Sequence, residues 1–130
     1  MAASVVVDAS AFVDLLVNPE LGAAVRERIT ECELYAPYHF TAEVFSALGR
    51  LRRGNLLSDD EVGRYLAILE NTHLQQIDNR TIINKAWLLR YQFSLKDALY
   101  IAVAYSLDIP LITTDKKLHE VAEVIQTTPR

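Results

Sequence analysis

The stretch SVVVDAS, residues 4–10, decides the fold, because three consecutive valines run directly into an aspartate. An uninterrupted β-branched run is typical of a parallel strand that is buried on both faces. A carboxylate at the end of such a strand is costly unless it is hydrogen-bonded, paired with a cation or bound to a metal ion. Asp8 is therefore either the cap of the helix that follows, a role that Ser10 could share, or one member of a larger site.

Segments with strand and helix character alternate along the rest of the chain. The expected strands are residues 5–7, 34–36, 74–77 and 111–113, with a further edge strand at 124–126. The expected helices are residues 9–17, 20–31, 40–53, 58–70, 80–91, 95–107 and 116–122. This alternation predicts an α/β fold, a three-layer α/β/α sandwich with a central, mainly parallel sheet. The length fits one domain over residues 1–130.

Composition restricts the class of protein. The longest uncharged run is residues 98–107, far short of the ~20 apolar residues that a membrane helix needs. No signal peptide is recognisable, and the single cysteine cannot form an internal disulfide, so we expect a cytoplasmic protein. The net charge of −4 counts against nucleic-acid binding, unless metal ions neutralise local acid and a small basic patch contacts phosphate.

Four separated carboxylates are the candidates for chemistry: Asp8, Glu43, Asp97 and Asp115. Each has an ordinary interpretation when taken alone. The three aspartates can cap helices or complement their dipoles, and a single glutamate usually lies on a solvated helix face. Taken together they indicate more, because the three aspartates lie at turns that a parallel sheet places on one edge.

A cluster of like charges raises the pKa values of its members and is tolerable when divalent cations lie between them. Ligand sets made only of oxygen favour hard ions, here Mg²⁺ or Mn²⁺, over zinc. Two such ions ~4 Å apart can activate water and stabilise the leaving oxygen in phosphodiester hydrolysis. The residues therefore suggest a metal-dependent nuclease.

Three motifs carry a resemblance to a known family: VVVDASAFVDLL at residues 5–16, TAEVFSALGRL at 41–51 and KDALYIAVAYSLDIPLITTDKKL at 96–118. In order and spacing, over essentially the whole chain, they resemble the PIN-domain ribonucleases, in particular the VapC-type toxins of toxin–antitoxin pairs. The resemblance implies an endoribonuclease that uses Mg²⁺ or Mn²⁺ and leaves 5′-phosphate and 3′-hydroxyl ends. It also implies a homodimer that is inhibited by a cognate VapB-like antitoxin.

The resemblance assigns roles to particular residues. The metal ligands and catalytic residues fall on Asp8, Glu43, Asp97 and Asp115. Ser10 would hold the first aspartate in place, and the hydroxyls of Thr113 and Thr114 would support the site. The chain departs from the family at Lys96, where an aromatic residue is common.

Substrate contacts are expected from Arg50, Lys96 and Lys116. Arg50 lies two helical turns after Glu43 on a similar face, although a solvated helix end that complements the dipole is an equally good interpretation. The three histidines are scattered, which favours core or surface roles for them. Apolar side chains in residues 56–69 exceed what one side of a peripheral helix needs, and we expect them to contact a partner protein.

Two other classes of protein remain open at this point. A non-catalytic PIN-like module that binds RNA or protein would have the same fold without metal-dependent cleavage. A phosphoryl-transfer domain is less consistent with the sequence. A haloacid-dehalogenase-type phosphatase requires a second aspartate where Ser10 stands, and a receiver requires an acidic pair near the first strand.

Overall fold

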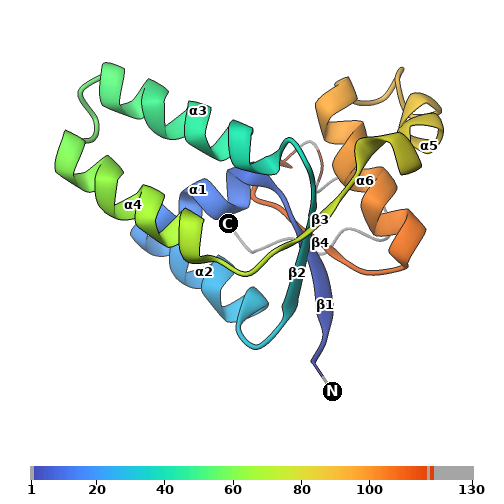
Figure 1. Ribbon diagram of the computed structural model, residues 1–130, viewed down its shortest axis with the longest axis horizontal. Coiled ribbons are helices and arrows are strands. Elements are labelled where there is room, and N and C mark those ends of the chain that lie inside the picture. The colour runs from blue at the N-terminus through green and yellow to red at the C-terminus, as the bar shows by residue number, and fades with distance from the viewer. Residues whose placement is uncertain (1, 117, 119–130) are drawn as a thin grey trace.

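Within residues 2–116 and 118, which the computed structural model describes, a four-stranded sheet runs between two layers of helices (Figure 1). The strands are all parallel and lie in the order β3-β2-β1-β4. They are β1 (Ser4–Val7), β2 (Glu33–Pro37), β3 (Gln75–Ile77) and β4 (Leu111–Ile112). The predicted fold class, a three-layer α/β/α sandwich with a parallel sheet, is confirmed.

The helices divide between the two faces of the sheet, as Figure 1 shows. One layer holds α1 (Ala9–Val17), α2 (Pro19–Ile29), α3 (Phe40–Arg53) and α4 (Asp59–Asn71). The other holds α5 (Ile83–Trp87) and α6 (Leu95–Leu107). In the part of the chain that the structure describes, no helix combines the length and the apolar character that crossing a membrane requires.

The order of the strands fixes where a ligand can bind. The chain builds β1, β2 and β3 outward in one direction, then returns through α5 and α6 to place β4 on the other side of β1. The strand order therefore reverses between β1 and β4, and parallel α/β sheets bind ligands beyond the carboxyl ends of the strands at such a point. Asp8 directly follows β1, and Asp115 follows β4 after two threonines.

Local signals in the sequence place most helix boundaries. The side chain of Asp8 caps α1 by accepting a hydrogen bond from the Ala11 amide. Ser58 and Glu61 form the predicted capping box at the start of α4. The bounds of α1, α3 and α6 agree with the prediction, and most other elements differ at their ends by one or two residues.

One predicted helix, residues 80–91, is wrong. The chain instead forms a 3₁₀ turn at Asn79–Thr81, the five-residue α5, and further turns. Three β-branched residues at 81–83 disfavour a continuous helix, and Ile82 has a non-helical backbone conformation. The turns after α5 let Phe93 enter the core. Most of the predicted helix 116–122 and all of the predicted strand 124–126 lie outside the described residues.

The hydrophobic core lies on both sides of β1. All three valines of the opening stretch are buried, as are six of the 13 residues of α6, which the sequence predicts to be apolar nearly all round. Phe12 of α1 packs edge-on against Phe40 at the start of α3, with 5.4 Å between ring centroids. This packing fixes α1, and with it the carboxylate at its N-terminus, against the sheet.

Gly22→Ala should destabilise the protein, because α2 crosses α1 at this glycine. A methyl group there would lie 2.6 Å from the Asp14 carbonyl oxygen and 3.0 Å from that of Leu15. Backbone atoms cannot move aside easily, so we expect a loss of about 1–3 kcal/mol in the free energy of unfolding, measured with urea. The matched control is Gly63→Ala in α4, where a methyl group meets nothing within 4 Å and should add roughly 0.5–1 kcal/mol. Equal effects of the two substitutions would contradict this packing.

Candidate metal centre

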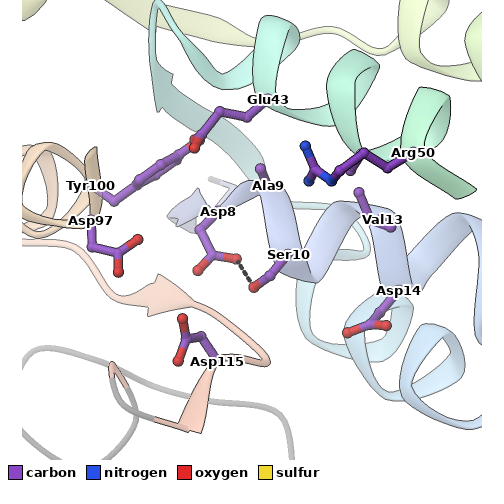
Figure 2. A pocket seen from close by; sticks show the side chains of 11 residues that line it. Asp8, Ala9, Ser10, Val13, Asp14, Glu43, Arg50, Asp97, Tyr100 and Asp115 are labelled. Atoms are coloured by element: carbon purple, nitrogen blue, oxygen red, sulfur yellow. Dashed lines mark hydrogen bonds between the residues drawn. The ribbon is translucent and has the colours of Figure 1, made fainter. Parts of the chain in front are cut away.

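A cleft of about 370 Å³ opens at the carboxyl ends of β1 and β4, where the strand order reverses. Figure 2 shows the side chains that line it. Of the residues that the structure describes, five carboxylates line this cleft: Asp8, Asp14, Glu43, Asp97 and Asp115. Arg50 and Tyr100 also line it. The four predicted acids, which are far apart in the sequence, therefore share one cavity.

Asp8 is the most buried of these carboxylates, with only 4% of its surface exposed. Its Oδ1 accepts hydrogen bonds from the Ser10 hydroxyl at 2.8 Å and from the Ala11 amide at 2.9 Å. Its Oδ2 accepts a hydrogen bond from the Thr113 hydroxyl. Ser10 and Thr113 thus make the supporting contacts that the resemblance implies, and Asp8 both caps α1 and faces the cleft.

Burial raises the pKa of the Asp8 carboxyl from 3.8 to about 6. The hydrogen bonds from Thr113, Ala11 and Ser10 lower this pKa in part, and the charge of Asp97 raises it further. The two carboxylates are therefore near enough for one to disfavour ionisation of the other. A cation between them would reverse that effect.

Asp97 and Asp115 face Asp8 across the cleft, from the first turn of α6 and from the turn after β4 (Figure 2). Ser94 caps α6, and its hydroxyl accepts a hydrogen bond from the Asp97 amide at 3.2 Å. The amide of Asp115 donates to the Thr113 hydroxyl at 3.0 Å. Thr113 therefore links two of the predicted ligands, Asp8 through its hydroxyl proton and Asp115 through its oxygen.

Glu43 occupies a different part of the cleft, against Tyr100 (Figure 2). The Tyr100 hydroxyl donates to its Oε1 at 2.7 Å, and burial together with the Glu43 charge raises the pKa of Tyr100, so that this hydroxyl remains a donor. His39 Nε2 lies 3.4 Å from the same oxygen, and Lys96 Nζ lies 3.7 Å from Oε2. Glu43 is therefore positioned by three residues outside the aspartate group.

A second cavity, of about 290 Å³, adjoins the first and has a different character. It is lined by His39, Ala42, Glu43, Ser46, Arg50 and Lys96. Glu43 and Arg50 line both cavities. The first cavity is strongly acidic. The second carries two cationic side chains, an imidazole and a hydroxyl beside Glu43.

The donor set fits a hard divalent cation, since it consists of carboxylate and hydroxyl oxygens converging from separate elements. Among residues 2–116 and 118, however, no three Asp, Glu, His or Cys side chains are already close enough to hold one ion. Binding would thus require small side-chain movements.

The other predicted residues divide into those at the cleft and those away from it. Arg50 and Lys96 line the cavities, and Lys96 contacts Glu43, as described above. Thr114 is buried and its hydroxyl donates to Asp14 Oδ2 at 2.6 Å. Lys116 is exposed and does not line either cavity.

Sequence reasoning missed three residues that the structure places at the site: Asp14, His39 and Tyr100. His39 precedes Glu43 by four positions and Asp14 follows Ser10 by four, the spacing that puts side chains on one face of a helix. That spacing could have identified both. Tyr100 follows Asp97 by three positions and was hidden within a run of apolar residues.

Comparison with known proteins gives matches over nearly the whole chain. The PIN domain family pattern matches residues 5–124. Ribonuclease VapC3 of Mycobacterium tuberculosis is 40% identical over 115 residues, which cover 88% of this chain and 84% of that protein. Ribonuclease VapC1 of the same organism is 37% identical, covering 87% of this chain and 86% of the relative. Ribonuclease VapC12 is 32% identical, covering 88% of each.

Solved structures share the fold. PAE2754 from Pyrobaculum aerophilum gives a TM-score of 0.68 at 20% identity, covering 98% of this chain and 90% of that one. Mycobacterium tuberculosis VapC20, described as a toxin that cleaves the sarcin–ricin loop, gives 0.65 at 16% identity, covering 92% and 98%. These likenesses confirm the architecture of the sheet and its helices. Together with the sequence matches, they show that the chain belongs to the PIN-domain family, in its VapC-type group.

Proposed function

We propose that this protein is a metal-dependent endoribonuclease and the toxin component of a toxin–antitoxin pair, acting in the cytoplasm. One observation carries the proposal: carboxylates from four separate segments line a single cleft at the point where the strand order reverses. The names of the relatives, ribonucleases of the VapC type, support RNA as the substrate. The cofactor is Mg²⁺ or Mn²⁺, because the available ligands are oxygens.

Asp8, Asp97 and Asp115 would hold one ion directly, and Glu43 would complete the site or serve a second ion. A bound ion of this kind supplies a nucleophile near neutral pH and stabilises the charge that develops at the scissile phosphate. Ser10 and Thr113 keep Asp8 oriented toward the cleft. Tyr100 keeps Glu43 at the border between the two cavities.

The second cavity would receive the RNA backbone beside the scissile bond. Its two cations, Arg50 and Lys96, can pair with a phosphate, and Arg50 reaches both cavities. Lys96 lies beside Glu43 and is largely exposed, so it is free to turn toward the substrate. Lys116 would contribute at the rim of the site, just after Asp115. These few cations offset the acidic net charge of the chain where phosphate must approach.

The proposed partners are a second copy of the chain and a VapB-like antitoxin. One related fold, VapBC2 from Rickettsia felis bound to a DNA fragment from its promoter, gives a TM-score of 0.69 at 12% identity, covering 97% of this chain and 99% of that one. An apolar cavity of about 450 Å³ between α5 and α6 offers a surface for the second copy, and the Trp87 side chain beside it is 54% exposed.

The surface expected at residues 56–69 needs revision. Five of its apolar side chains pack against the protein's own core: Leu57, Val62, Tyr65, Leu66 and Leu69. Leu56 and Ile68 are the large apolar residues that remain exposed in this segment. A partner that binds here would therefore contact fewer apolar groups than the sequence suggests.

The proposed function is tested by incubating the purified protein with RNA and either Mg²⁺, Mn²⁺ or excess chelator. Cleavage should require the metal and leave 5′-phosphate and 3′-hydroxyl ends. RNA that stays intact with both metals, in a protein that nevertheless binds RNA, would favour the non-catalytic module instead. Cleavage that persists in chelator would contradict the metal-dependent mechanism.

A further inference from the structure

Two consecutive threonines, Thr113 and Thr114, connect the turn after β4 to α1 and its N-cap through side-chain hydrogen bonds. The Thr113 hydroxyl donates to Asp8, at the N-terminus of α1. The Thr114 hydroxyl donates to Asp14 Oδ2 at 2.6 Å and lies 3.3 Å from the Ser10 hydroxyl. Thr114 is only 3% exposed, so its side chain is enclosed between these two residues of α1. The turn that carries Asp115 is thus bound to α1 at two successive positions.

These side-chain bonds matter because the neighbouring backbone pairing is short. β4 consists of two residues, which pair with Val6 and Val7 of β1. Beyond Ile112 the chain leaves the sheet, and the described hydrogen bonds at Thr113 and Thr114 join it to α1 instead. The two hydroxyl bonds therefore help to hold the turn that carries Asp115.

We propose that Asp14 is a positioning residue for the metal centre: by holding Thr114 it fixes the turn that presents Asp115. The inference rests on the proposed metal-dependent function and extends it to a residue outside the four predicted acids. Groups that orient metal ligands typically contribute a factor of 10–100 in metal affinity or activity. Asp14 is about one helical turn from Ser10, so α1 and its N-cap together carry the first ligand, its support and the anchor for the last ligand.

A competing role for Asp14 is that of an additional ligand, since its side chain also lines the cleft. The two roles differ in what they require. Holding Thr114 requires a hydrogen-bond acceptor, which an asparagine amide oxygen also provides. Ligating a divalent cation depends on the negative charge, which asparagine lacks. The two roles also differ in their dependence on Thr114, whose hydroxyl matters only to the anchoring role.

The experiment measures Mn²⁺ affinity by calorimetry without RNA, for Asp14→Ala, Asp14→Asn, Thr114→Val and the Ala/Val double variant. We expect Asp14→Ala and Thr114→Val each to weaken binding 10–100-fold. The double variant should be no weaker than the worse single one, because both remove the same bond. Asp14→Asn should lose less than the roughly tenfold lower limit of that range. Asp60→Ala, an exposed acid on α4, is the control and should bind normally.

A second readout needs no metal. The Asp115 amide donates to Thr113, so its hydrogen exchange in metal-free protein reports how firmly the turn is held. Exchange should accelerate in Asp14→Ala and Thr114→Val and stay near the wild-type rate in Asp14→Asn. Unchanged exchange in Asp14→Ala would overturn the proposal, as would equal Mn²⁺ losses in both Asp14 variants with normal binding in Thr114→Val. If wild type neither binds Mn²⁺ nor cleaves RNA, the proposed function fails, while the exchange rates still decide whether Asp14 holds the turn.

Discussion

Asp8→Asn will lower metal-dependent RNA cleavage by more than ~100-fold while leaving the fold intact. Asparagine is as good a helix cap as aspartate, and its oxygen can accept the bonds from Ser10 and the Ala11 amide. Its amide group can donate to Thr113, whose oxygen already accepts from Asp115. What the substitution removes is the negative charge. A direct metal ligand should matter more than the orienting groups for which factors of 10–100 are typical.

Asp97→Asn should have the same effect, because Asp97 faces the same space from α6 and its charge acts on Asp8 (Figure 2). Initial rates of RNA cleavage with saturating Mn²⁺, together with circular dichroism of each variant, provide the measurement. Asp60→Asn, on the exposed first turn of α4, is the matched control and should cleave at the wild-type rate. If either site variant cuts RNA as fast as the parent protein, the ligand assignment is wrong.

The stability of the metal-free protein should depend on pH through Asp8. The pKa of this carboxyl is about 6 in the folded protein and 3.8 ordinarily. Between these values the folded state holds more protons than the unfolded state, so the free energy of unfolding falls as pH rises. The loss begins near pH 4, is complete above pH 6 and amounts to about 3 kcal/mol. Below pH 4 both states are protonated and the contribution is fully retained.

Comparison with Asp8→Asn isolates this effect from other titrating groups. Urea unfolding in chelator at pH 4, 5, 6, 7 and 8 gives the free energy of unfolding of each protein. Wild type should lose stability relative to Asp8→Asn as pH rises, by most of the ~3 kcal/mol. A difference between the two proteins that stays constant across this range would show that Asp8 is not buried as an ionisable group.

The fold was largely predictable because its determinants are local. The valine run before Asp8 specifies a buried strand, and the capping box at Ser58 specifies the start of α4. The long apolar run of α6 specifies a largely buried helix. The segment around α5 was not predictable in this way. Its conformation depends on the burial of Phe93, which is a tertiary requirement. Helical periodicity in residues 80–91 was outweighed by three β-branched residues at 81–83 and by that requirement.

The site was predictable to the extent that topology determines it. Parallel strands bring Asp8 and Asp115 to one edge, so their proximity follows from the order of the elements. The contact of Glu43 with Tyr100 joins α3 to α6, helices of opposite layers, and no local pattern specifies it. The contact of Glu43 with His39 is local, since the two residues are four positions apart. The bond between Asp14 and Thr114 joins residues 100 positions apart, and sequence spacing carries no sign of it.

The central claim is that Asp8, Asp97 and Asp115 together hold a divalent cation. Anomalous diffraction from a crystal grown with Mn²⁺ tests it most directly, because the ion is located independently of any activity. The account predicts one strong anomalous peak in the cleft, in direct contact with carboxylate oxygens of all three aspartates. A peak elsewhere on the protein, or an ion that touches only one of the three, would contradict it.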